Sequence, residues 1–481
     1  MARNVHEIIY KYNLPITRDR QSVHECLNNY YKVFLTELKE SFSLATNTDF
    51  PNSFYEKLEK TLFPQIKEQC KIILDITNLN PGYLRAQQYE LFDKLMQLLI
   101  ENDAFRFLTL KKGDIMVRTR SESSPFERPF ERKDLFHIPY DKREITSHQR
   151  FSDLGDSCLY LSIFPSLRYF ADDMIDLSWK ESGMPKIFYF SIFEVQDNLN
   201  CLHFAKQGST YLKEYDEANT QEERNDRQEA IEQYLMTFPL RTAISMSVKD
   251  KFIEHGINYH EEYNFPQLLI QWLQKNSTFD GLTYQSATKL PETKNSKSYN
   301  IVFPVKNINR TTGYDEKLKK IFKLSPPKKI DFFARIKTLD NNIKDVQQYA
   351  RELELKLTKY QGTEVHPYYN LLAICYSFDS ICSSIKNVNE THMETSFQQS
   401  NTLWRMAMLI FKTIENAKTA EQWVDLYKRY TGDTVLTEND YQDVLLRFNI
   451  VVNALIELKN ILSINEMNAY LFSQPDYQFV D

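Results

Sequence analysis

Glycine is scarce in this chain, which has 10 glycines among 481 residues, with the closest two 25 positions apart. Loops that hold the phosphates of a dinucleotide or a nucleoside triphosphate need closely spaced glycines, because a side chain keeps the backbone away from the phosphate. The sequence therefore excludes both a GxGxxG fingerprint of the Rossmann type and a P-loop.

Strong net charge, cysteine pairs and long apolar runs are also missing. The net charge of -6 gives no general attraction to nucleic acid or to anionic lipid. The six cysteines form no CxxC pair, so neither a zinc site nor a disulfide framework is indicated, and we expect buried free thiols. The N-terminus has no apolar signal region, and no run of eighteen apolar residues occurs. We expect a cytoplasmic protein without a membrane segment, a metal site or a bound cofactor.

The chain contains enough apolar residues to build several cores, because 42% of its residues are apolar and 14% are aromatic. Residues 1–105 carry apolar positions at helical spacing, which predicts a helical N-terminal domain. Residues 106–310 change to short β-rich runs separated by turns and helical pieces. Residues 326–481 return to amphipathic helices. The pattern predicts a helix-rich α+β protein with a central mixed domain flanked by two helical domains.

Pro326 and Pro327 mark the predicted boundary before the C-terminal domain, because adjacent prolines cannot continue a helix. The basic run that contains them, residues 317–329, is interpreted as a solvated and hinged connection. The charged segment at residues 214–235 is interpreted as a solvated excursion without chemistry. The C-terminal helices have apolar stripes that need a partner surface, so we expect them to cover the central domain or to dock a regulatory partner.

Several blocks of sequence in the middle of the chain occur in an order that resembles one known family. The blocks are DIMVRTR (114–120), DLFHIPYDKREITSHQRFSDLGDSCLYLS (134–162), FPLRTAISMSV (238–248), NFPQLLIQWLQ (264–274), FDGLTYQS (279–286) and the closing strand YNIVFPV (299–305). Together they resemble the RES family, which is named for an Arg, a Glu and a Ser. The resemblance implies an ADP-ribosyltransferase-like fold for the central domain and an activity that degrades NAD+.

The chemistry of NAD+ cleavage explains why such a site needs arginine and a carboxylate. Breaking the nicotinamide–ribose bond passes through an oxocarbenium-like centre, which a nearby carboxylate stabilises. The planar fork of an Arg matches the oxygens of the diphosphate better than the point charge of Lys does. By resemblance, Arg118 and Arg150 bind the substrate, with Arg120 as a competitor for the role of Arg118. A surface salt bridge is the alternative for each of them.

Tyr160 and Ser286 also match the family pattern. The resemblance assigns Tyr160 to stack on the nicotinamide or the ribose, and an ordinary half-buried strand tyrosine is the alternative. It assigns Ser286 to orient a ribose or phosphate oxygen, and a local turn contact is the alternative. His137 matches as well, but a histidine between two apolar residues is more often structural.

The expected Glu is where the sequence departs from the family. The family places it about ten residues after the LYL strand, where this chain has Ala171, followed by Asp172 and Asp173. Asp172 is the predicted catalytic carboxylate, because a shift of one residue can be absorbed by a different start to the helix. Glu181 and Glu194, like Asp176, are further from the pattern.

A short motif near the N-terminus raises a different function. Arg18 and His24 fit the R-x4-6-H pattern of helical HEPN ribonucleases. The motif is degenerate and precedes the first apolar helix, so chance explains it better. A ribonuclease would require His24 on an exposed helix face beside Arg18.

The sequence thus predicts an NAD+ glycohydrolase or phosphorylase that acts as a toxin or as an abortive-infection effector in phage defence. The alternatives are a catalytically impaired nucleotide-binding or assembly module and, third, the HEPN-type ribonuclease. NAD+ is the expected substrate and not a bound cofactor. An antitoxin, a sensor, a phage protein and a second copy of the chain are candidate partners, whereas no nucleic-acid or membrane contact is indicated.

Overall fold

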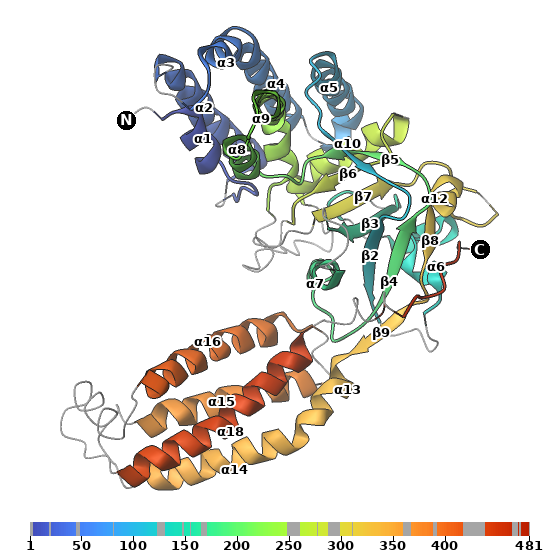
Figure 1. Cartoon of the computed structure of the whole chain (residues 1–481). Coiled ribbons are helices and arrows are strands. Elements are labelled where there is room, and N and C mark those ends of the chain that lie inside the picture. Colours follow the sequence, from blue (N-terminus) through green and yellow to red (C-terminus); the bar gives the residue numbers. More distant parts are fainter. Residues whose placement is uncertain are drawn as a thin grey trace.

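A computed structural model of the chain shows helices packed around one β-sheet (Figure 1). The described residues are 3–18, 21–44, 49–79, 81–122, 130–146, 149–153, 155–164, 171–247, 260–276, 278–286, 299–309, 311–358, 367–387, 392–416, 438–463, 470 and 473–480. The helix-rich α+β class is confirmed. The finer likeness to an ADP-ribosyltransferase fold stays a prediction.

Nine strands in the described residues form one sheet in the order β1-β5-β6-β7-β3-β2-β4-β8, with β9 also pairing with β4. All neighbours are antiparallel except β5 and β6, which are parallel. The bounds are β1 Phe107–Leu110, β2 Ile115–Ser121, β3 Cys158–Ile163, β4 Ile187–Val195, β5 Leu199–His203, β6 Gly281–Tyr284, β7 Tyr299–Pro304, β8 Phe322–Leu324 and β9 Lys328–Asp331.

Helices from the N-terminal part and from the middle of the chain pack together on one side of the sheet (Figure 1). They are α1 Val5–Lys11, α2 Val23–Ser41, η1 Phe42–Leu44, α3 Asn52–Lys57, η2 Leu58–Leu62, α4 Phe63–Thr77, α5 Pro81–Glu101, α8 Gly208–Asp216, α9 Gln221–Ile244, η4 Glu261–Tyr263 and α10 Asn264–Lys275. The start of α2 is fixed by a capping box between Ser22 and Glu25. The apolar stripe of α2 is buried as its helical spacing predicts, at Leu27, Tyr31, Phe34 and Leu38.

The charged segment at residues 214–235 is not a solvated excursion throughout its length. It contains the end of α8 and the first half of α9, whose charged residues up to Glu229 are mostly exposed. From Ala230 onward, every residue of α9 except Gln233 is buried. Arg241, on this buried half, donates hydrogen bonds to the backbone oxygens of His203 and Phe204 at the end of β5. The interpretation holds for the exposed part up to Glu229 and is wrong for residues 230–235, where the helix enters the core.

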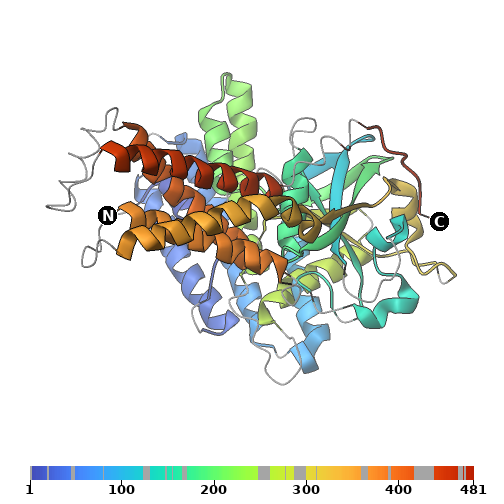
Figure 2. The ribbon, with the colours of Figure 1, turned by 90° about the horizontal axis from the view of Figure 1, so that it is seen from below.

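The C-terminal helices form a second group on the other side of α7, which spans Ala171–Glu181 (Figures 1 and 2). Their apolar cluster includes α7 and the residues of β2 and β4 that lie on the same sheet face. Trp179 of α7 is fully buried there and contacts the rings of Phe332 and Phe397. The helices are α13 Phe332–Ile336, η5 Lys337–Leu339, α14 Asp340–Leu357, α15 Pro367–Lys386, α16 Glu394–Asn416 and α18 Glu438–Leu462.

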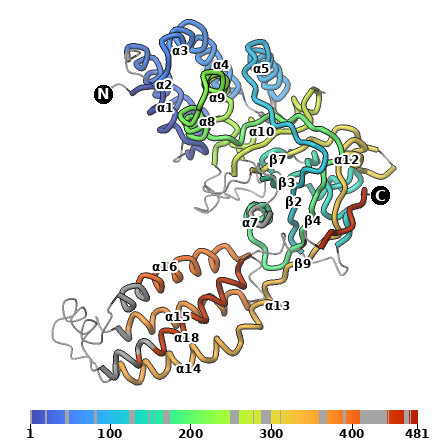
Figure 3. Tube along the Cα trace, viewed as in Figure 1, coloured from blue at the N-terminus to red at the C-terminus, as the bar shows by residue number. Residues whose placement is uncertain are grey.

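The chain around Pro326 and Pro327 is part of the sheet and not a hinged linker. The two prolines lie between β8 and β9, and both of these strands pair with β4. The chain end returns to the same place, where Gln478 and Leu324 exchange backbone hydrogen bonds of 2.8 and 3.0 Å (Figure 3). The expectation of a solvated hinge fails because apolar residues of the basic run, including Phe322 and Leu324, are buried. The remaining elements are α6 Arg132–Leu135, η3 Tyr140–Ile145 and α12 Glu316–Ile321.

These contacts change what removal of the C-terminal helices should do. We expect residues 1–325, expressed alone, to be poorly soluble and to lose cooperative unfolding, because the apolar faces of α7 and β4 become exposed. Loss of the packing around a buried tryptophan alone costs about 3–5 kcal/mol. Thermal unfolding followed by near-UV circular dichroism checks this. A truncated chain with the melting temperature of the full chain would instead support the separable cover that the sequence suggested.

Candidate functional site

One face of the sheet is divided between two apolar clusters, and a row of polar side chains lies between them. Successive residues of a strand point to opposite faces, so the strand registers show which residues share a face. Asn300 of β7 pairs with Tyr284 of β6 on one side and with Ser162 of β3 on the other. Ser162 pairs in turn with Val117 of β2. Tyr284 packs against the N-terminal cluster and Val117 against the C-terminal one, so Ser162 and Asn300 lie at the junction.

Helix α7 covers this junction with its polar side. Ser178 accepts a hydrogen bond of 2.9 Å from the backbone N–H of Thr119 and lies 3.0 Å from the Thr119 hydroxyl. Ser182 contacts the same hydroxyl at 3.4 Å. Positions 178, 181 and 182 lie on one side of a helix because residues three and four apart are neighbours. Glu181 therefore approaches the same face of the sheet as the two serines.

Glu181 is the carboxylate of this junction. The residue remains accessible to solvent, yet the surrounding protein desolvates the carboxyl group and raises its pKa above the ordinary value of 4.5. Interactions with the Ser286 hydroxyl and the Asn300 amide, and the positive charge of Arg150, lower the pKa and oppose that increase. A desolvated carboxyl group on a residue that is otherwise exposed is a candidate for a functional site.

Arg150 lies at the tip of a tight turn that is held from several sides. Gln149 and Ser152 exchange backbone hydrogen bonds across the turn, at 2.9 and 3.2 Å. The guanidinium group of Arg150 donates to the backbone oxygens of Ile244 and Met246, at 3.0 Å each, just where α9 ends. These two bonds fix the orientation of the guanidinium group, including that of its remaining N–H groups.

Tyr160 holds the turn in place from the sheet. Its hydroxyl accepts a hydrogen bond of 3.2 Å from the backbone N–H of Phe151 and lies 2.9 Å from the Ser152 hydroxyl. The ring of Phe151 packs against that of Tyr284 at 4.6 Å between centroids. Tyr160 thus positions Arg150 in the described structure. Its stacking on a substrate stays a prediction.

The structure brings Arg150, Tyr160 and Ser286 together, and the described carboxylate beside them is Glu181. Asp172 lies in the first turn of α7, nine residues before Glu181, which is about 13 Å along the helix axis. The side chains of Asp172 and Asp173 lie outside the described part of the structure. Among the carboxylates whose side chains the structure describes, Glu181 interacts with the predicted serine, and the catalytic role of Asp172 stays a prediction.

Arg118 and Arg120 belong to the other face of the sheet. They alternate along β2 with Val117 and Thr119, which face α7. Arg118 donates to the backbone oxygen of Phe136 at 2.9 Å, and Arg120 donates to that of Asp134 at 2.7 Å. Burial lowers the pKa of Arg118 to about 9. Both arginines therefore organise the segment around α6, and a role in substrate binding stays a prediction.

Two histidines singled out in the sequence have structural partners. The Nε2 atom of His137 accepts a hydrogen bond of 3.0 Å from the backbone N–H of Asp315, and burial lowers its pKa to about 4. His137 is the structural histidine that its apolar neighbours indicated. His24 lies 2.7 Å from the Thr77 hydroxyl, whereas Arg18 pairs with Glu261 and Glu262. These contacts give the ribonuclease interpretation no support.

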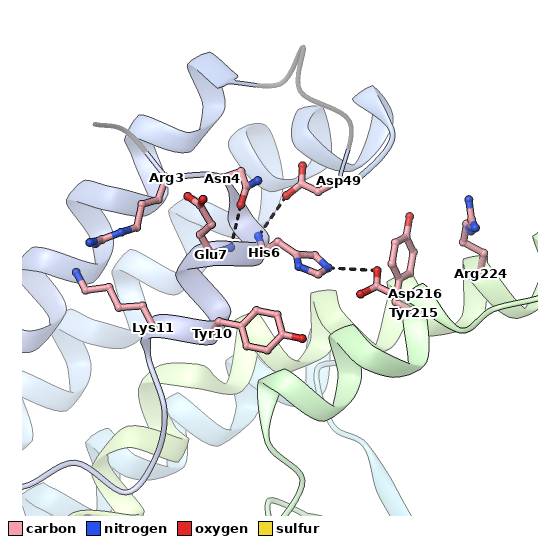
Figure 4. Close-up of a pocket in the computed structure, with 10 residues that line it drawn as sticks. All are labelled: Arg3, Asn4, His6, Glu7, Tyr10, Lys11, Asp49, Tyr215, Asp216 and Arg224. Carbon is pink, nitrogen blue, oxygen red and sulfur yellow. Dashed lines mark hydrogen bonds and ion pairs between the residues drawn. The ribbon is translucent and has the colours of Figure 1, made fainter. Parts of the chain in front are cut away.

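A cavity of about 780 Å³ lies away from the junction, between α1, α8 and the start of α9 (Figure 4). Its polar groups pair with one another or with residues just outside it, such as Glu37, which pairs with Arg3 and Lys11. His6 donates its backbone N–H to Asp49 and lies 3.4 Å from Asp216 through its ring. Tyr215 and Arg224 form a cation–π pair at 5.7 Å. Charges of both signs line this cavity, so it indicates no particular ligand.

Comparison with known proteins gives one similarity. The chain is 27% identical over 337 residues to the protein named "Putative toxin YopC" of Bacillus subtilis (strain 168), an alignment that covers 66% of this chain and 69% of that protein. No family model matches the chain, and no solved structure matches it.

Two expectations from the sequence concern membrane spans and metal sites, and the described residues bear on both. None of their helices combines the length and the apolar character that crossing a bilayer requires. No three acidic, histidine or cysteine side chains among them are grouped to hold a metal ion. All six cysteines are buried free thiols, as expected.

Glu181 and Asn300 are the members of the site that the sequence did not single out as functional. Glu181 was set aside because it lies ten residues past the family position, and only the fold shows that the end of α7 reaches the sheet. Asn300 did carry a signal. It is a polar residue within the apolar strand YNIVFPV, at a position where β-branched and aromatic residues are the rule.

The raised pKa of Glu181 predicts a pH-dependent stability difference for Glu181→Gln. Folding favours the protonated carboxyl group, so the wild type loses stability as the pH rises from the ordinary value of 4.5 through the raised pKa. Glutamine cannot ionise, so we expect equal melting temperatures below about pH 4 and a more stable variant at pH 7. Melting curves between pH 4 and 8 check this. A variant that is less stable at pH 7, by a margin that grows with pH, would contradict the assignment.

Proposed function

We propose that this protein is a toxin that cleaves the nicotinamide–ribose bond of NAD+. The observation that carries the proposal is the meeting of Arg150, Glu181 and Ser286, because the carboxyl group of Glu181 interacts with both other side chains. These are the three residue types of the RES pattern that the sequence resembles. The name of the Bacillus subtilis protein supports the toxin role.

In this proposal Glu181 acts on the reacting sugar. Bond cleavage leaves positive charge on the anomeric carbon of the ribose, and an ionised carboxylate beside that carbon stabilises it. The Ser286 hydroxyl holds one carboxylate oxygen and so fixes the direction of the other. Glu181 also accepts the proton of an incoming water molecule, which adds to the anomeric carbon as nicotinamide leaves.

Arg150 supplies the positive charge for the diphosphate. Its guanidinium group is already oriented by the oxygens of Ile244 and Met246, so little rotational freedom is lost when an anion binds. The ring of Tyr263 lies 5.8 Å from the same guanidinium group and forms an aromatic wall beside it. A nucleotide with a charged diphosphate and flat rings at both ends suits this combination.

A toxin that consumes NAD+ needs restraint in the cell that makes it. We therefore extend the proposal to a controlling partner of the antitoxin or sensor kind, in a phage-defence setting. The acceptor is water for a glycohydrolase and inorganic phosphate for a phosphorylase. The reaction releases nicotinamide with either acceptor, so measuring nicotinamide detects both activities. A rate that depends on phosphate then identifies phosphate as the acceptor.

We expect the purified full chain to release nicotinamide from NAD+, and Glu181→Gln to lower the rate about 100-fold or more, the range for loss of a catalytic acid–base group. Asp172→Asn is the matched comparison on the same helix and should keep most of the activity. Release is measured by liquid chromatography with and without phosphate.

Three outcomes would count against this assignment. Full activity in Glu181→Gln would place the carboxylate elsewhere, and loss of activity in Asp172→Asn alone would restore the residue that the sequence favoured. A wild type that binds NAD+ without turnover under all conditions would leave a nucleotide-binding module as the function.

We expect Arg150→Lys to weaken NAD+ binding about tenfold to 100-fold, because an ammonium group cannot make the paired hydrogen bonds of a guanidinium group with phosphate. Calorimetric titration of the catalytically silent Glu181→Gln protein, with and without the second change, measures this. Arg143→Lys is the control, since Arg143 is exposed and stacks on Tyr140. Equal affinity in both arginine variants would exclude Arg150 as the phosphate ligand.

A further inference from the structure

Asn300 is a polar residue in the middle of the sheet, with only 3% of its surface exposed. Its Oδ1 atom accepts a hydrogen bond of 3.3 Å from the Ser162 hydroxyl on the neighbouring strand β3. That bond orients the amide, because the oxygen must face β3. The Nδ2 group is then directed to the opposite side, toward β6, where Ser286 follows the end of the strand.

The Nδ2 group has no hydrogen-bond partner among the described residues. Native proteins rarely leave a buried donor unpaired, because the group has lost its water without gaining a replacement. The Glu181 carboxylate is an acceptor that the Asn300 amide influences, although the amide lies outside hydrogen-bond geometry in the described structure. A valine would fill the same place on β7 without this cost.

We infer that Asn300 is a positioning residue, whose Nδ2 group binds the ionised Glu181 carboxylate, with or without a bound substrate. Ser286 and Asn300 then hold the carboxylate from two directions and keep it aimed at the ribose. The effect of the Asn300–Glu181 contact on catalysis rests on the proposed function. The contact itself is independent of that function, because it joins two residues of this chain.

The charges around Glu181 decide what loss of this contact does. The titratable groups that face it are Arg150 from the turn, Tyr263 from η4 and Tyr284 from β6, while Lys180 on its own helix pairs with Asp176 at 2.5 Å. Burial raises the pKa of both tyrosines, so they stay neutral at physiological pH. Arg150 is the charged group among them, and the two neutral donors therefore carry much of the remaining stabilisation of the ionised carboxylate.

Asn300→Leu removes the donor while it keeps the branched shape and the number of heavy atoms of the side chain. Without the donor, we expect the pKa of Glu181 to rise by about one unit, the usual size of one lost hydrogen bond to a carboxylate. The acidic limb of the nicotinamide-release profile should move to higher pH by the same amount. Ser162→Ala keeps Asn300 but frees its amide to rotate, so it should give a smaller shift in the same direction.

The first measurement uses stability alone and needs no NAD+ turnover. Melting temperatures of the full chain between pH 4 and 8 are compared for wild type, Glu181→Gln, Asn300→Leu and the double variant. We expect the pH dependence of Asn300→Leu to be displaced by about one unit, and this displacement to vanish when Glu181 is glutamine. If Asn300→Leu instead lowers the melting temperature equally at every pH, Asn300 is only a structural residue and the inference fails.

The second measurement is the pH profile of nicotinamide release for the wild type, Asn300→Leu and Ser162→Ala. A shifted acidic limb supports the positioning role, and an unchanged limb with a lower maximal rate overturns it. If the wild type releases no nicotinamide, the proposed function fails, and the stability comparison still decides whether Asn300 binds Glu181. If Asn300→Leu does not fold, Ser162→Ala carries the same comparison with a change of one hydroxyl group.

Discussion

The site depends on one constraint: polar side chains in the middle of a buried sheet face must be given hydrogen-bond partners. An apolar helix over Thr119 and Asn300 would leave polar atoms of both residues unpaired, and each such atom costs stability. The polar side of α7 answers part of this need through Ser178 and Ser182. Glu181 lies on the same polar side of α7 as these two serines. The need to cover the polar residues of the junction therefore also brings the carboxylate to the sheet.

The opposite side of α7 is held by the C-terminal helices. Trp179 is locked between rings from α13 and α16, and Lys186, fully buried, donates to the backbone oxygens of Ser384 and Asn387. A buried ammonium group satisfied by fixed oxygens resists displacement, because moving it would leave an unpaired charge. The C-terminal helices therefore set the position of Glu181 without supplying a group to the site.

The sequence was informative wherever a local pattern was sufficient. Tyr160 and Arg150 lie ten residues apart on a turn and the strand that follows it, so their proximity is a local matter. Glu181 could not be found in this way, since its place depends on how far α7 extends and where its end meets β6 and β7. For Arg118 and Arg120, strand alternation shows which residues share a face, but it cannot show which face carries the site, so their role in substrate binding stays a prediction. The prolines near position 326 were misleading, because the edge of a sheet tolerates proline as well as a linker does.

The pairing of Gln478 with Leu324 makes the C-terminal helices a closed loop on the sheet. The chain leaves the sheet after β9 and returns to it some 150 residues later, and Arg132 fastens the returning segment through Asp476 and Gln478. Bringing such distant ends together carries an entropy cost of roughly 4 kcal/mol. The C-terminal helices are attached to the sheet edge both through β9 and through Gln478. They therefore separate from the sheet only when both attachments are broken. In topology it behaves as a domain inserted into the sheet, even though it comes last in the sequence.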